Sequence, residues 1–168
     1  MDSQLIFREG LPAEKNSLQQ LGILSYSQFS QILSPADWAT MHRFLYEDKM
    51  WDQLVNNSKI FVCETNDKLA GMAYLVPSNN PTHIYPADWC YVRMVGVDPA
   101  YRGKGIARRL TQMCVDYARE TNEKIVGLHT SEKMNDAIHI YESIGFKLYK
   151  EIDPIYGMRY FTYRLEIP

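Results

Sequence analysis

Apolar positions along the chain follow two periods, and the change of period divides the sequence into strands and helices. Seven segments concentrate or alternate apolar and β-branched residues over strand-like lengths and are bounded by turn residues. The predicted strands are residues 3–9, 59–65, 68–76, 89–97, 124–130, 146–152 and 158–167. Asp153 to Gly157 is predicted to join the last two, and residues 77–86, with three prolines, are predicted to form a loop.

Other segments place apolar residues at helical spacing. The predicted helices are residues 13–29, 34–45, 106–117 and 134–144, with residues 50–55 as a broken turn that continues the second helix. Ser34 suits an N-cap and Pro35 suits the first helical position. Gly145 is predicted to cap the last helix at its C-terminus.

The order of these elements predicts the fold class. The helix at 106–117 lies between two apolar strands, which favours a parallel β-α-β unit with a right-handed crossover. The remaining strands are joined by short turns or lie at the chain ends. The sequence therefore predicts an α/β fold with a mixed, largely antiparallel sheet, a central parallel unit and helices on both faces. No repeat or linker interrupts residues 1–168, so one domain is expected.

The turn between strand 89–97 and the following helix is the strongest candidate for chemistry. It reads Arg102-Gly103-Lys104-Gly105-Ile106-Ala107. Glycine permits positive φ and close approach of a ligand, and the first amides of a helix bind anions. Four cations, at positions 102, 104, 108 and 109, favour a phosphate ligand here. The alternative is a glycine turn with solvated basic side chains.

Two common nucleotide motifs do not fit this turn. A Walker loop is excluded because Lys104 is followed by glycine rather than Ser or Thr. A dinucleotide fingerprint needs a third glycine and an acidic residue about 20 positions later. Glu120 and Glu123 are near that distance, but they fall at the predicted helix end and before the next strand.

Composition narrows the classes of partner. The net charge of −2 and the pI of about 6.1 give no general nucleic-acid or membrane character, and no apolar run is long enough to span a bilayer. Met1–Gln4 lack the start of a signal peptide. Cys63, Cys90 and Cys114 have no metal-ligand spacing, so buried free thiols, no metal site and a cytoplasmic location are expected.

Three motifs together carry a resemblance to a known family. The turn matches Arg/Gln-x-x-Gly-x-Gly/Ala as Arg102-x-x-Gly105-x-Ala107. Val95-x-Val97-x-Pro99 is similar to the strand that precedes it, and Ala137-x-x-x-Tyr141-x-x-x-Gly145-Phe146 resembles the helix and strand that follow. In order and spacing, residues 90 to 150 resemble the GNAT superfamily of N-acetyltransferases.

This resemblance implies acetyl-CoA as the acetyl donor. The turn amides would hold the pyrophosphate, and the strand at Val95 to Val97 would pair with the pantetheine arm. A backbone N–H near Met94 or Val95 would polarise the thioester carbonyl. The implied cofactor-binding residues are Met94, Val95, Val97, Arg102, Gly103, Lys104, Gly105, Ile106 and Ala107.

The resemblance also implies a general acid. Tyr141 stands where the family places a tyrosine that protonates the leaving thiolate, a role that suits a phenol. The alternative is a tyrosine that only packs on the core. The reaction expected is direct attack of an amine on the thioester, without an acyl-enzyme. Cys90 has no sequence partner that would make it a nucleophile.

Two positions depart from the family pattern. Met134 stands where the family often has a cofactor-contacting asparagine, and Asn135 follows one place later. Tyr91 stands where many members have a glutamate base on the central strand. Deprotonation of the amine could then go through water, or use Asp88, His83 or His129.

The acceptor side is expected to include the first helices, the loop at 77–86 and the last hairpin. These segments carry the aromatic residues Tyr46, Trp51, Tyr85, Trp89, Tyr156 and Tyr160, and the acidic residues Glu47, Asp48 and Asp88. The acidic residues could attract a cationic amine. The expected function is N-acetyltransfer to a primary amine, with a small molecule favoured over a protein or peptide.

Other readings remain open at this point. The chain could bind acyl-CoA as a regulatory module without turnover, or it could be a structural α/β domain. An exposed edge strand near the C-terminus could pair with a second subunit to form a homodimer.

Overall fold

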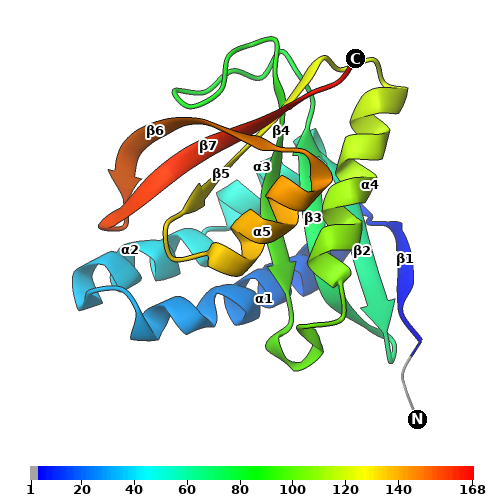
Figure 1. Ribbon diagram of the computed structural model, residues 1–168. Helices are drawn as coiled ribbons and strands as arrows, with labels where there is room; N and C mark the ends of the chain where they lie inside the picture. The colour runs from blue at the N-terminus through cyan, green and yellow to red at the C-terminus, as the bar shows by residue number, and fades with distance from the viewer. Residues whose placement is uncertain (1–3) are drawn as a thin grey trace.

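The strands of the computed structural model, which describes residues 4–168, form a seven-stranded sheet (Figure 1). They are β1 Ile6–Glu9, β2 Lys59–Thr65, β3 Lys68–Val76, β4 Cys90–Val97, β5 Ile125–Ser131, β6 Lys147–Ile155 and β7 Met158–Glu166. Their order is β1-β2-β3-β4-β5-β7-β6, and every pair is antiparallel except β4 and β5. This arrangement confirms the predicted mixed, largely antiparallel sheet.

Helices cover both faces of the sheet, as predicted. Figure 1 shows α4 (Ile106–Glu120) and α5 (Asn135–Ile144) in front of the sheet. The helices α1 (Lys15–Tyr26), α2 (Pro35–Leu45) and α3 (Asp48–Asn57) lie behind and below it. One apolar cluster fills the α4 side of the sheet and a second fills the α1 to α3 side. The fold is therefore a sheet between two helical layers.

The predicted helix ends are set by local hydrogen bonds. The Ser34 side chain accepts a hydrogen bond from the Asp37 amide at 3.2 Å, and Pro35 opens α2. Gly145, at φ +121°, ends α5, where its amide donates to the Tyr141 carbonyl at 3.2 Å. Both caps confirm the sequence prediction, and the second places Tyr141 in the last turn of α5.

Two helix predictions were wrong. Residues 13–29 do not form one helix: α1 is flanked by the 3-10 segments Pro12–Glu14 and Ser27–Gln31. The tighter turn after Tyr26 draws Phe29 into the core. Residues 50–55 are part of α3, a separate helix, because Met50, Trp51, Leu54 and Val55 form its buried face.

The turn between the last two strands is shorter than predicted. β6 continues to Ile155, and only Tyr156 and Gly157 form the turn, at φ +52° and +73°. A two-residue turn with both φ values positive matches the twist of a hairpin. β6 forms the exposed sheet edge near the C-terminus, while β7 lies between β5 and β6.

β4 and β5 separate beyond their first residues, which opens the middle of the sheet. They pair only at Cys90 with Val126 and at Tyr91 with Gly127. From there β5 follows β7 to the end of β5, so the two parallel strands diverge (Figure 1). One edge of β4 after Tyr91 therefore has no neighbouring strand among the described residues.

The open part of β4 also carries a β-bulge. Tyr74 and Met72 on β3 pair with Arg93 and Gly96, so β4 has one extra residue between these pairs. Met94 in the bulge has φ +51°, which is uncommon for a residue with a side chain. A bulge redirects backbone and side chains next to sites. Here it lies at the point where the sheet opens.

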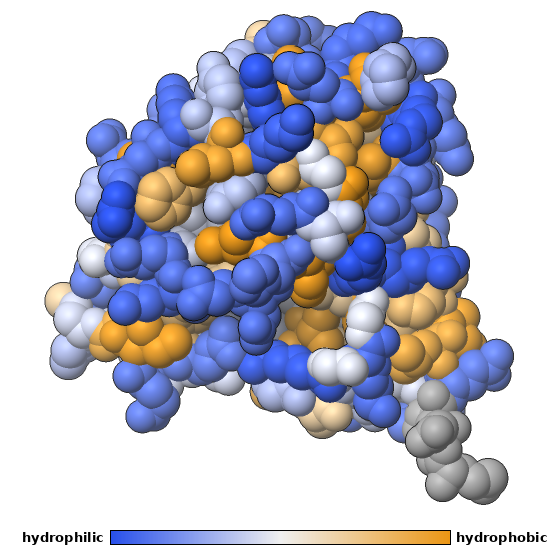
Figure 2. Space-filling model, viewed as in Figure 1, coloured by the Kyte–Doolittle hydropathy of each residue, from blue (hydrophilic) through white to orange (hydrophobic). Residues whose placement is uncertain are grey.

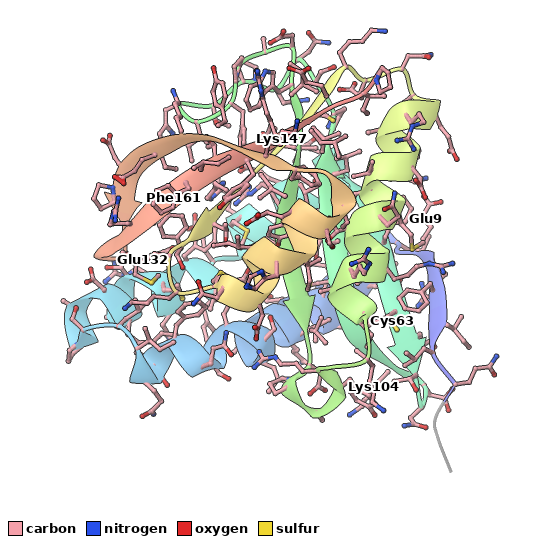
Figure 3. The ribbon with its side chains drawn as sticks, in the orientation of Figure 1. Glu9, Cys63, Lys104, Glu132, Lys147 and Phe161 are labelled. Atoms are coloured by element: carbon pink, nitrogen blue, oxygen red, sulfur yellow. The ribbon has the colours of Figure 1, made fainter. Side chains whose placement is uncertain are left out.

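Cys63, Cys90 and Cys114 are buried free thiols, as predicted. Cys63 lies on β2 behind α4 (Figure 3). Within residues 4–168, no cluster of His, Cys, Asp and Glu could hold a metal ion, and no helix has the length and apolar character to cross a membrane. Residues 1–3 lie outside the described residues. They include residue 3, the first residue of the predicted strand 3–9, and most of Met1–Gln4, where no signal peptide was expected.

Candidate active site

The loop between β4 and α4 turns sharply and leaves its amides exposed. Asp98 ends β4, and its carboxylate accepts a hydrogen bond from the Ala100 amide at 2.9 Å. Gly103 and Gly105 follow at φ +79° and +77°, and a Cβ on either would meet nothing within 4 Å. No side-chain hydrogen bond caps α4 at Gly105, and its first turn contains no acidic residue. The start of the helix therefore has the features that suit an anion ligand.

A groove of about 740 Å³ runs from this loop along the open edge of β4. Its walls come from the end of α1, from β4, and from the facing ends of α4 and α5. Figure 2 shows apolar side chains in the seam between α4 and α5, surrounded by hydrophilic surface. Val95, Val97, Arg102, Gly103, Gly105, Ile106 and Ala107 line the groove, all of them predicted cofactor residues.

The basic residues near the loop have different surroundings. Arg102 donates to Gln28 Oε1 at 2.6 Å and to the Ser25 carbonyl at 3.0 Å, which ties the loop to the end of α1. Arg108 donates to Ser143 Oγ at 2.6 Å, and the Arg109 guanidinium lies over the Phe7 ring. Lys104 is exposed on the loop and does not line the groove (Figure 3). Lys104 is thus the one predicted cofactor residue outside both cavities of the site.

A second cavity, of about 440 Å³, lies where β4 and β5 diverge. Residues from α2, the loop at 77–86 and the β6–β7 hairpin line it, together with Met94 of the bulge. It shares four lining residues with the groove: Tyr26, Val95, Met134 and Tyr141. The groove and the cavity therefore meet at the bulge of β4 and the inner face of α5.

Tyr141 stands at this junction. Its side chain is 8% exposed and packs edge-to-face with Phe146, at 6.1 Å between ring centroids. Burial raises the pKa of the phenol above its usual value, so the hydroxyl keeps its proton throughout the neutral range. Met134 and Asn135, at the start of the same helix, both line the groove.

The candidate bases have distinct positions. Tyr91, in place of a strand carboxylate, donates its hydroxyl to the Asn80 carbonyl at 3.1 Å. His83 and His129 line the second cavity, whereas Asp88 does not. The Tyr85 hydroxyl and His129 Nδ1 lie 2.6 Å apart. Burial, helped by the charges of Arg93 and His83, lowers the pKa of His129 to about 4, so its imidazole is neutral and weakly basic at pH 7.

This shift predicts an NMR titration in which the His129 imidazole protonates near pH 4, far below the usual value of about 6.5. The unfolded chain then binds the proton first, so His129 lowers the free energy of unfolding as the pH falls from about 6.5 toward 4. Titration of His129 near pH 6.5 would contradict the described burial.

The predicted acceptor residues divide into two groups. Tyr85, Tyr156 and Tyr160 line the second cavity, as does the loop segment at 82–85. Trp51 and Trp89 are instead buried in apolar clusters, and Tyr46 is 54% exposed beside His42. Glu47, Asp48 and Asp88 do not line the cavity either, so they do not contact an acceptor bound there.

Two lining residues were missed in the sequence. Tyr26, the last residue of α1, borders both cavities. Arg93 lies on β4 one residue before the bulge and lines the second cavity. A charged residue inside an otherwise apolar central strand was a visible signal for Arg93. The sequence gives no such signal for Tyr26, because its place beside both cavities depends on where α1 ends.

Comparisons with known proteins match this arrangement. The model of the acetyltransferase (GNAT) family matches residues 26–146. An uncharacterized N-acetyltransferase of Methanocaldococcus jannaschii is 27% identical over 112 residues, which are 62% of this chain and 49% of that protein. A mycothiol acetyltransferase of Thermomonospora curvata is 31% identical over 97 residues, 58% of this chain and 30% of that protein. The chain thus spans half or less of the length of these two relatives.

Solved structures share the fold at low identity. The PaiA N-acetyltransferase of Thermoplasma acidophilum, in complex with coenzyme A, has a TM-score of 0.78 at 14% identity, with 98% of this chain and 99% of that chain covered. The ribosomal-protein-S18-alanine N-acetyltransferase of Escherichia coli has a TM-score of 0.71 at 16% identity, with 98% and 94% covered. The family model covers well over half of the sequence. The chain belongs to the acetyltransferase (GNAT) family.

Proposed function

We propose that this chain is an N-acetyltransferase that moves an acetyl group from acetyl-CoA to a primary amine of a small molecule. The observation that carries the proposal is the junction at Tyr141, where the groove beside the glycine loop meets the second cavity. A two-substrate transfer needs two binding sites that share one reacting point.

The groove fits acetyl-CoA, the donor of GNAT acetyltransferases. Free amides at the start of α4 suit the pyrophosphate, and the open Cβ positions of Gly103 and Gly105 leave room for it. The unpaired edge of β4 suits the pantetheine amides, which can hydrogen-bond as an added strand would. When bound, acetyl-CoA supplies an activated acetyl group as a thioester.

The residues at the junction would act on the two ends of the reaction. Backbone N–H groups at the bulge, near Met94 and Val95, would stabilise negative charge that develops on the carbonyl oxygen. The amine would form the new C–N bond directly as the C–S bond breaks. Tyr141, held protonated by burial, would give its proton to the departing sulfur.

The amine must lose a proton during the reaction, and the strand glutamate that accepts it in many family members is replaced here by Tyr91. No Asp or Glu lines the second cavity within the described part of the chain. The low pKa of His129 makes it a weak base, so water and His83 are the favoured routes. An amine that is largely deprotonated at the working pH would need no strong base.

The second cavity favours a small acceptor over a peptide. Its volume of about 440 Å³ lies within the range of about 300–1,000 Å³ for small-molecule sites. Tyrosines at 26, 85, 91, 156 and 160 are among its walls. An acceptor peptide would need an extended groove with exposed backbone partners. The walls of the second cavity instead come from several elements on different sides of the junction, among them α2, β5 and the β6–β7 hairpin.

Calorimetric titration with acetyl-CoA, combined with a CoA-release assay over a panel of amines, tests the proposal. We expect one acetyl-CoA to bind per chain, and at least one small amine to turn over. Binding without turnover on any small amine or N-terminal peptide would favour an acyl-CoA-binding module instead. Absence of acetyl-CoA binding would contradict the proposal outright.

A further inference from the structure

Arg93 places a positive charge in the wall of the second cavity, the site proposed for the acceptor. It lies on β4 opposite Tyr74 of β3, directly before the bulge residue Met94. Tyr91, two positions earlier, also lines the cavity, as expected when alternate strand residues share a face. The arginine is partly buried, so its guanidinium is not simply spread on the outer surface.

The charge of Arg93 is not neutralised within residues 4–168. None of the ion pairs or side-chain hydrogen bonds there involves its guanidinium. Arg8 pairs with Glu14 at 2.7 Å, and Arg102 donates to Gln28 at 2.6 Å. Arg43 and Arg109 also have no ion pair among the described residues, but both are exposed and neither lines the cavity. A partly buried guanidinium that lines a cavity and has no partner of its own is available to a ligand that carries a carboxylate.

Among residues 4–168, no Asp or Glu lines the cavity beside Arg93. The titratable groups that line the cavity with Arg93 are His83, His129 and the tyrosines at 26, 85, 91, 141, 156 and 160. Burial raises the pKa of Tyr26 and Tyr85, an effect that the Arg93 charge partly opposes. Burial and the Arg93 charge both lower the pKa of His129. The protonated phenols of these tyrosines and the neutral imidazole of His129 therefore lie around the Arg93 cation.

This electrostatic pattern excludes some acceptors and favours others. A polyamine would bring two or more positive charges into a cavity that holds a cation and, among the described lining residues, no carboxylate. An amine with an anionic group would bring a counter-charge. The planar guanidinium pairs with a carboxylate through two parallel hydrogen bonds, which would also orient the amine.

We propose that Arg93 binds a carboxylate of the acceptor, so that the substrate class is a small amino acid-like amine with an apolar or aromatic body. The aromatic walls would hold that body, and the junction at Tyr141 would receive its amine. This inference rests on the proposed acetyltransferase function. Arg93 is here a binding residue that sets specificity, with no part in proton transfer.

The test compares matched acceptors and matched variants. The acceptors are the α-amino acids, each with its decarboxylated amine, such as phenylalanine with phenethylamine, assayed by CoA release at saturating acetyl-CoA. Binding of the same compounds is measured by calorimetry in the presence of CoA. The variants are Arg93→Gln, Arg93→Lys, and Arg43→Gln as a control, because Arg43 is exposed on α2 and does not line the cavity.

We expect a carboxylate-bearing amine to be preferred over its decarboxylated form. In Arg93→Gln, KM for that acceptor should rise by roughly 10- to 100-fold, the effect of losing a hydrogen-bonded charge partner, with kcat nearly unchanged. Arg93→Lys should recover part of the loss, and Arg43→Gln should behave as wild type. The acetyl-CoA affinity should stay the same in all three variants.

Three results would overturn the inference. The first is a preference for decarboxylated amines or polyamines. The second is binding of acetyl-CoA with neither binding nor turnover of any carboxylate-bearing amine. The third is a carboxylate preference that persists in Arg93→Gln. Failure of the wild-type chain to bind acetyl-CoA would instead overturn the proposed function and remove the basis of this inference, so the two failures are distinguishable.

Discussion

Replacing Gly105 with glutamate should weaken acetyl-CoA binding by at least about 100-fold in a calorimetric titration, which corresponds to about 2.7 kcal/mol. Gly105 is the N-cap of α4 at φ +77° and lines the groove. A glutamate there would project a side chain and a negative charge into the site proposed for the pyrophosphate. Both effects act on the bound ligand, which is why the loss should be large.

Gly105→Ala is the matched control for backbone strain. A Cβ at this position meets nothing within 4 Å, so alanine adds the strain of a left-handed residue without filling the groove. We expect a loss of about 1 kcal/mol in the free energy of unfolding and only a small change in acetyl-CoA affinity. If Gly105→Glu stays folded and binds acetyl-CoA as wild type does, the anion site is not at this loop.

Replacing Tyr141 with phenylalanine should lower kcat by about 100-fold or more while the acetyl-CoA affinity is retained, because general acid catalysis contributes factors of that size. The ring and its contact with Phe146 are kept, and only the hydroxyl at the junction is lost. The measurement is steady-state CoA release with a saturating acceptor, beside calorimetry with acetyl-CoA.

Tyr163→Phe is the control for loss of a tyrosine hydroxyl in the same apolar cluster. Tyr163 belongs to the same apolar cluster as Tyr141 and is 7% exposed, but it lines neither the groove nor the cavity. We expect its kcat to stay within a few-fold of wild type. Equal kcat values for Tyr141→Phe and wild type would assign Tyr141 a packing role and leave the protonation of the sulfur to water.

Features that depend on local spacing were predictable from the sequence. The positive-φ glycines of the turn, the N-cap at Ser34 and the cap at Gly145 each arise from a few neighbouring residues. The parallel pairing of β4 and β5 was predictable too, because the helix between them is an ordinary crossover. These features place the loop and Tyr141 without further information.

The acceptor side was less predictable because its walls come from segments far apart in the sequence. Whether Trp51 faces a cavity or the core depends on how α3 packs on the sheet, and it packs into the core. The bulge at Met94 depends on the pairing of β4 with β3, which apolar periodicity does not reveal. The same packing explains why Arg93 lines the cavity, whereas the acidic residues expected there, Glu47, Asp48 and Asp88, do not.

A crystal structure of the chain with bound CoA tests the central claim most directly, because the claim concerns where two sites meet. The account predicts the pyrophosphate within hydrogen-bond distance, about 3 Å, of the amides at residues 103–107. It also predicts the pantetheine arm along Val95–Val97 of β4 and the sulfur beside the Tyr141 hydroxyl. A pyrophosphate bound away from this loop, or a sulfur that does not reach the junction with the acceptor cavity, would contradict it.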